Sequence, residues 1–157
     1  MAHIALAVSD QERSRRFYET YFEFDPESVQ VADDGVVLIE GPGDVLLALG
    51  EIDEPISLPS FLHFGFRAAE SPDEVRAFRS RLEADAVEIV EFCDEPDYVS
   101  VKCRDPDGYV LEFAWESESA WKTRTIMSVG LNPFVGARSS GHADDATTRS
   151  RSARMST

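Results

Sequence analysis

The chain has 157 residues, with 30 acidic against 15 basic side chains and a formal net charge of -15 at pH 7. A surface this acidic repels phosphates and anionic headgroups, so nucleic acids and membranes are not expected partners. No apolar run reaches the roughly 18 residues of a membrane-spanning helix, and no secretory signal pattern opens the sequence, so we expect a cytoplasmic protein.

The first half of the chain starts with a predicted strand at 3–8, "HIALAV". Ser9 and Glu12 have the spacing of a capping box, which predicts a helix at about 10–22. Three short strands are expected after this helix, with "ADDGV" as one of the turns, near 28–32, 36–40 and 44–50.

The second half repeats this order after the linker "EIDEPISLPS". A strand at 63–68, "HFGFRA", precedes Ser71 and Glu74, a second capping box that predicts a helix at 72–84. Strands are then expected near 87–92, 98–104 and 109–115, with "DPDG" before the last. The sequence therefore predicts an α+β fold made of two βαβββ modules.

Several predicted strands carry bulky apolar residues on one face and a potential metal ligand among small residues on the other. The ligand faces are His3 with Ala5 and Ala7, His63 with Gly65 and Arg67, and Glu112 with Val110 and Ala114. An ordinary solvated face would carry Lys, Glu, Thr and Ser throughout. Because two histidines and one carboxylate occupy matching positions of a repeat, we favour a confined metal site over a solvent-facing surface.

The segments "HIALAVSD", "LHFGFR" and "DPDGYVLEF", in this order and spacing over residues 1–116, resemble the vicinal oxygen chelate superfamily. This is also called the glyoxalase/bleomycin resistance/dioxygenase family. The resemblance implies that the two modules curl into a cup-shaped, eight-stranded mixed sheet around one divalent metal ion.

The resemblance also implies that His3, His63 and Glu112 are the metal ligands. At the family's fourth ligand position the chain has Ala48, which cannot bind a metal and where glyoxalase I normally has a carboxylate. Three protein ligands leave open positions for a substrate. Two imidazoles and one carboxylate suit Fe(II), Mn(II), Ni(II) or Zn(II), and the sequence does not choose among them.

The predicted strand 98–104 contributes further candidates. Tyr98, Ser100 and Lys102 alternate onto one face, which we expect to line the cup. Tyr98 is a candidate proton donor, Ser100 a candidate substrate contact, and Lys102 or Arg67 a candidate for holding an anionic group. The alternative is that these are ordinary polar residues at strand ends.

The function expected is that of a metal-dependent enzyme acting on a small molecule with vicinal oxygens, by glyoxalase-like lyase or dioxygenase chemistry. The alternatives are a fosfomycin-type thiol transferase and a metal-free, drug-sequestering protein like the bleomycin-resistance members. Each known activity leaves a gap. Ala48 replaces the glyoxalase carboxylate, His142 is the only further histidine for a dioxygenase, and Ala5 stands where a thiol transferase usually has threonine.

The domain is expected to span 1–118, with modules at about 1–51 and 60–116, and to form a homodimer that covers exposed strand edges. Residues 119–157, rich in Ser, Thr, Ala and Arg, are expected to be a largely disordered tail. Residues 1–118 hold 28 acids and 9 bases, a net -19, and the whole chain has only two lysines. This composition is typical of halophilic proteins.

The two cysteines are expected to stay reduced. A hairpin across "DEPD" places Cys93 near Tyr98 and Cys103 near Glu88, too far apart for a disulfide.

Overall fold

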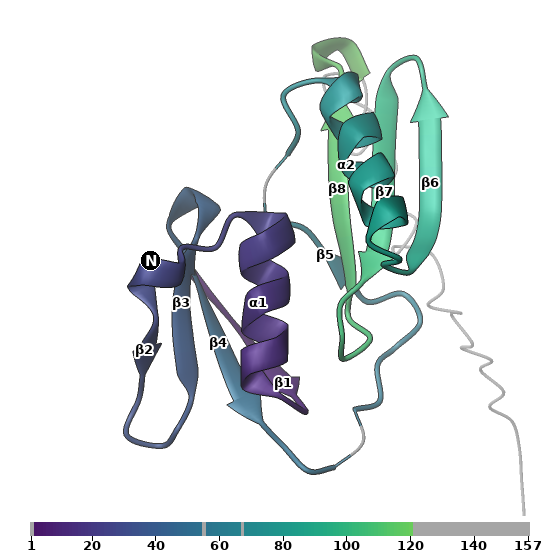
Figure 1. Cartoon of the computed structure of the whole chain (residues 1–157). Coiled ribbons are helices and arrows are strands. Elements are labelled where there is room, and N and C mark those ends of the chain that lie inside the picture. Colours follow the sequence, from purple (N-terminus) through teal and green to yellow (C-terminus); the bar gives the residue numbers. More distant parts are fainter. Residues whose placement is uncertain (1, 55, 67, 121–157) are drawn as a thin grey trace, which may run out of the picture.

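The structure is a computed structural model that describes residues 2–54, 56–66 and 68–120. Two modules with the same order of elements follow each other along the chain (Figure 1). The first comprises β1 (Ala2–Val8), α1 (Gln11–Phe22), the 3₁₀ helix η1 (Pro26–Ser28), β2 (Gln30–Val31), β3 (Val37–Gly41), the 3₁₀ helix η2 (Pro42–Asp44) and β4 (Val45–Glu51). The second comprises β5 (His63–Phe64), α2 (Pro72–Ala84), β6 (Ile89–Glu95), β7 (Tyr98–Arg104) and β8 (Val110–Glu116).

The predicted pair of βαβββ modules is confirmed, although β5 is shorter than the strand expected over 63–68. From residue 121 onward, the predicted C-terminal tail lies outside the described residues. Within the described part of the chain, no helix is long and apolar enough to span a membrane.

The eight strands are divided equally between two mixed sheets, with orders β1-β4-β3-β2 and β5-β8-β7-β6. In each sheet the first and last strands of the module pair in parallel, and the other pairs are antiparallel. The registers of the parallel pairs correspond, since His3 lies opposite Leu46 and His63 lies opposite Val110. Ala48 follows Leu46 by two residues in β4, and Glu112 follows Val110 by two residues in β8. Ala48 and Glu112 therefore occupy equivalent positions in the two modules.

Both helices lie where the sequence predicts them, but of the two predicted capping boxes only the second forms, and only in part. Ser71 Oγ accepts the Glu74 N–H at 3.3 Å, but the Glu74 carboxylate accepts the N–H of Glu70 at 2.8 Å instead of that of Ser71. The capping box at Ser9 is wrong. Asp10 caps α1 by accepting the Arg13 N–H at 2.9 Å, because Ser9 is engaged by a carboxylate of the second module.

Each helix packs on its own sheet, and aromatic rings between the helices join the modules into one core (Figure 1). The predicted alternation is present in β1 and β8, where Val8 and Leu111 are fully buried. Phe22 of α1 lies between Phe66 and Phe78 of the second module, with ring centroids 6.0 and 5.7 Å away. Edge-on contacts of this kind stabilise beyond the apolar area that they bury.

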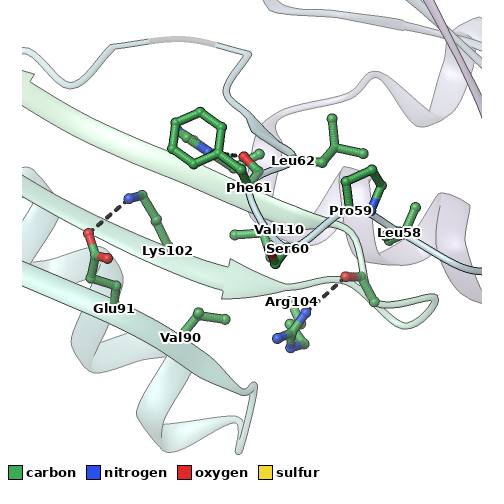
Figure 2. A pocket seen from close by; sticks show the side chains of 12 residues that line it. Leu58, Pro59, Ser60, Phe61, Leu62, Val90, Glu91, Lys102, Arg104 and Val110 are labelled. Carbon is green, nitrogen blue, oxygen red and sulfur yellow. Dashed lines mark hydrogen bonds and ion pairs between the residues drawn. The ribbon is translucent and has the colours of Figure 1, made fainter.

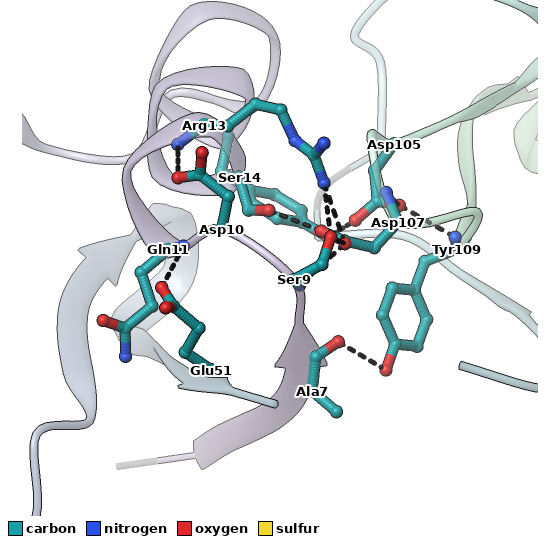
Figure 3. A network of polar contacts seen from close by, with 11 residues as sticks. Ala7, Ser9, Asp10, Gln11, Arg13, Ser14, Glu51, Asp105, Asp107 and Tyr109 are labelled. Atoms are coloured by element: carbon teal, nitrogen blue, oxygen red, sulfur yellow. Dashed lines mark hydrogen bonds and ion pairs between the residues drawn. The ribbon is translucent and has the colours of Figure 1, made fainter. Parts of the chain in front are cut away.

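The "DPDG" turn before β8 contributes a buried carboxylate, Asp105, to the junction of the modules (Figure 3). Asp105 accepts the hydroxyl of Tyr18 on α1 at 2.6 Å and the N–H groups of Asp107 and Tyr109 at 2.9 and 2.8 Å. Burial raises the pKa of Asp105, against the lowering effect of these hydrogen bonds.

Asp107, two residues later, binds the start of α1 with a side chain that is 1% exposed (Figure 3). Its Oδ1 accepts the Ser9 N–H at 2.9 Å, the Ser9 hydroxyl at 2.6 Å and Arg13 Nη2 at 2.9 Å. Its Oδ2 accepts the Ser14 hydroxyl at 2.6 Å. The two aspartates of the turn are therefore used to hold the modules together.

The β6–β7 hairpin is shifted from its predicted register by two residues at Cys93 and by one residue at Cys103. Glu95 lies opposite Tyr98, so β6 extends further than expected and the turn is shorter. Cys93 consequently lies opposite Ser100 and Cys103 opposite Ile89. Both thiols are free, in agreement with the prediction that they form no disulfide.

Candidate metal centre

His63 begins β5 with a half-buried imidazole whose Nδ1 lies 3.0 Å from the carbonyl oxygen of Phe61. A carbonyl oxygen only accepts hydrogen bonds, so Nδ1 carries the proton and donates it. When the ring is neutral, this tautomer leaves a lone pair on Nε2. Nε2 lies 3.5 Å from Oε2 of Glu112.

Glu112 lies in the middle of β8 with a side chain that is 20% exposed. Its second oxygen, Oε1, accepts the hydroxyl of Tyr98 at 2.7 Å. Burial raises the pKa of Tyr98, and the carboxylate raises it further, so the phenol stays protonated and donates. This bond turns Oε2 of Glu112 toward the imidazole of His63.

Gly65, directly after β5, is required by close packing of the backbone beside Glu112. A Cβ atom added to Gly65 would lie 2.6 Å from the carbonyl oxygen of Glu112, so only glycine fits at this point next to β8. Gly65, Glu112 and Ala114 line an open hollow of about 360 Å³. The small residues that the sequence places on the ligand faces, Gly65 and Ala114, therefore leave open space next to Glu112.

His3 is exposed on β1 in the other sheet, opposite Leu46 of β4. Among the described residues, no three His, Cys, Asp or Glu side chains lie close enough together to hold a metal ion. One chain therefore brings His63 and Glu112 together but does not add His3 to them. Ala48, opposite Ala5, adds no ligand either.

The other sequence candidates lie near this pair to different extents. Lys102 is opposite Glu112 and its Nζ donates to Glu91 at 2.8 Å. Ser100 is opposite Ala114 but only 1% exposed, which leaves its hydroxyl covered. Arg67 lies outside the described residues.

A pocket of about 350 Å³ adjoins His63 on the same face of the sheet (Figure 2). Its residues come from the linker between the modules and from β6 to β8, among them Leu58, Phe61, Leu62, Val90, Glu91, Lys102 and Arg104. Sequence reasoning missed Phe61 and Arg104. Arg104 could have been found, because the alternation of side chains along β7 places it on the same face as Lys102. Phe61 could not, because no local sequence pattern indicates that the linker folds over the sheet.

The family model of the Glyoxalase/Bleomycin resistance protein/Dioxygenase superfamily matches residues 1–113. The chain belongs to this superfamily. The match covers both modules, so the resemblance inferred from the three sequence segments is confirmed. No curated protein matches the chain.

Solved structures support the same fold. A glyoxylase/bleomycin resistance protein/dioxygenase domain from Frankia sp. EAN1pec has a TM-score of 0.60 at 21% identity, covering 74% of this chain and 96% of that one. Lactoylglutathione lyase from Agrobacterium tumefaciens has a TM-score of 0.54 at 24% identity, with 73% and 91% covered. A mutant of the fosfomycin resistance protein FosX from Listeria monocytogenes, complexed with Mn(II) and 1S,2S-dihydroxypropylphosphonic acid, has a TM-score of 0.65 at 18% identity, with 80% and 96% covered.

Proposed function

We propose that the protein is a divalent-metal-dependent enzyme of its superfamily, acting on a small molecule with vicinal oxygens by lyase or dioxygenase chemistry. The observation that carries this proposal is the approach of two ligand-type atoms, His63 Nε2 and Glu112 Oε2, to 3.5 Å. A proton on Nε2 makes this contact an ion pair, and a metal ion bound by both atoms takes the place of that proton. Because such atoms bind transition metals at about 2.0–2.2 Å, the pair fits a shared ion.

The surrounding residues support a ligand role for this pair. The Phe61 carbonyl holds the His63 tautomer, and the Tyr98 hydroxyl orients Glu112, as outer hydrogen bonds do at metal sites. A bound divalent ion would act as a Lewis acid on two substrate oxygens. FosX, whose fold is similar, was solved with Mn(II) and a dihydroxy phosphonic acid.

The third ligand in this proposal is His3 of a second copy of the chain, in a homodimer. His3 is exposed in one chain, and its face continues over Ala5, Ala7, Leu46 and Ala48. A second module that covers this face would bury its small apolar residues and bring a histidine to the His63–Glu112 pair. Burial of such surface favours association.

Metal analysis tests the proposed site. We expect His63→Ala and Glu112→Gln to weaken divalent metal binding by about 100-fold or more while the protein stays folded, since outer partners alone change metal affinity about 10–100-fold. His142→Ala, in the tail, is the matched control and should bind metal like the wild type. Equal metal content in wild type and His63→Ala, or none in either after reconstitution, contradicts the proposal and favours a sequestering protein.

Mixed dimers test the shared site. His3→Ala and His63→Ala chains refolded together should regain one intact site per heterodimer, because the first chain keeps His63 and the second keeps His3. If both ligands came from the same chain, every site would lack one histidine and mixing would restore nothing. A metal-reconstituted screen of methylglyoxal hemithioacetals, catechols, and fosfomycin with a thiol then identifies the reaction.

A further inference from the structure

The pocket beside His63 is lined by apolar side chains from both the linker and the sheet and by two cations of β7 (Figure 2). Leu58, Pro59, Leu62, Val90 and Val110 provide apolar surface, and both Leu62 and Val90 are more than 40% exposed. Lys102 and Arg104 provide two positive charges on the same face of β7. A ligand that matches both kinds of side chain has an apolar body and a negatively charged end.

Cations are rare in this part of the chain, so their position is informative. Residues 1–120 contain a single lysine, Lys102, and net -19 of charge falls within residues 1–118. The arginines of α1 and α2 that form ion pairs bind carboxylates outside this pocket, for example Arg16 with Glu12. Lys102 and Arg104 instead lie under the linker, next to a residue of the proposed metal site.

The existing partners of the two cations leave donors for a ligand. Lys102 Nζ donates to Glu91, whose side chain is 57% exposed, and Arg104 Nε donates to Glu88, which is 65% exposed. Arg104 Nη1 also donates to the carbonyl oxygen of Gly108 at 3.1 Å. Because both carboxylates are more than half exposed, these ion pairs are weakly held, and a ligand carboxylate can replace or join them. An ammonium has three donor hydrogens and a guanidinium five. The bond to Glu91 also shows that Lys102 holds a carboxylate in this position.

Phe61 lines the pocket on the side of the metal pair. Its side chain is 86% exposed, and its ring meets that of His63 edge-on at a centroid distance of 5.5 Å. Since Lys102 lies directly opposite Glu112 in the β-ladder, the positive end of the pocket and the proposed metal site are neighbours. A single small molecule can therefore reach both.

We propose that the substrate is an amphipathic carboxylic acid whose carboxylate is separate from its vicinal oxygens. The carboxylate binds Lys102 and Arg104 in place of Glu91, and the apolar part contacts Leu62, Val90 and Val110. The placement of the vicinal oxygens at His63 and Glu112 rests on the proposed function. The carboxylate subsite stands on the pocket alone.

A pair of nearly isosteric ligands tests this proposal, 3,4-dihydroxyphenylacetate and its neutral amide, 3,4-dihydroxyphenylacetamide. Calorimetric titration of metal-loaded full-length protein should give at least a tenfold lower Kd for the acid. Lys102→Gln should abolish this preference, and Arg16→Gln, which removes an exposed cation elsewhere, should keep it. Glu91→Gln should tighten binding of the acid several-fold and leave the amide unchanged, because it removes the internal competitor.

Lys102→Gln should weaken binding of the acid, whereas Glu91→Gln should strengthen it. These opposite changes in Kd distinguish a ligand site from a purely structural ion pair, because loss of a structural ion pair would change the Kd of acid and amide alike. Equal Kd values for acid and amide in the wild type, or an unchanged preference in Lys102→Gln, would overturn the proposal. Metal content is measured on the same samples. If no metal is bound, the proposed function fails, while the comparison of acid with amide in metal-free protein still decides the carboxylate subsite.

Discussion

Replacing Asp107 with alanine should destabilise the protein more than any surface ion pair does. The substitution leaves the Ser9 N–H, two hydroxyls and one Arg13 nitrogen without the carboxylate that they contact at 2.6–2.9 Å. Hydrogen bonds to a charged group contribute about 1.5–3 kcal/mol each, and the contributions of one network do not add. Removing one partner of a fully buried ion pair costs about 3–5 kcal/mol, but the Arg13 side chain is 46% exposed and part of this cost is relieved by solvent. We therefore expect a loss of about 2–4 kcal/mol for Asp107→Ala.

Asp94→Ala is the matched control, because Asp94 also pairs with an arginine, Arg76, but has a side chain that is 39% exposed. Its loss should be much smaller than that of Asp107, because solvent screens an exposed ion pair. Urea unfolding of both variants at fixed ionic strength, followed by far-UV circular dichroism and by fluorescence, measures the difference. If Asp107→Ala unfolds with the same free energy as Asp94→Ala, the buried network does not stabilise the junction of the modules and the argument is refuted.

The effect of Asp107→Ala should also depend on pH. Burial alone would raise the pKa of Asp107, but hydrogen bonds from Ser14 and Ser9 and the charge of Arg13 lower it below its ordinary value. A lowered pKa stabilises the folded state at all pH values above the unfolded pKa of about 3.9 and loses this effect as the pH falls through the folded pKa. The difference between wild type and variant should thus be constant from pH 7 to 5 and shrink below pH 4.

Two further predictions concern packing and charge. Gly65→Ala should destabilise the fold by about 1–3 kcal/mol and weaken metal binding, since its Cβ would press on the Glu112 carbonyl. Gly50→Ala, whose Cβ would meet nothing nearer than a carbonyl oxygen at 4.0 Å, is the control, and equal losses for both would contradict this explanation. Salt should raise the midpoint of thermal unfolding well beyond the change seen for a protein of balanced charge, because screening at 1 M reduces the Debye length to about 3 Å. Deletion of residues 119–157, which carry a net +4, should leave this dependence at least as strong, and a flat series in KCl would show that the acidity is incidental.

The candidate site was only partly predictable, and the reason lies in the range of its contacts. Strand alternation places His63 and Glu112 on the ligand faces of β5 and β8, and the corresponding registers of the two sheets place Ala48 where Glu112 stands. The pairing of Lys102 with Glu91 and the cover of the linker over the sheet depend on neighbours from different strands. No local spacing contains that information.

The sequence by itself determined the two βαβββ modules, because hydrophobic period, turn residues and the separation of α from β segments are local properties. Tertiary structure decided what the polar residues of the motifs do. Ser9 has the spacing of a helix cap, yet it binds Asp107, which lies 98 residues away. Asp107 and Asp105 belong to the most recognisable segment of the chain, yet they hold the modules together. A buried carboxylate accepts hydrogen bonds from the donors that the tertiary structure places next to it. Its role is therefore set by long-range packing and not by the local sequence.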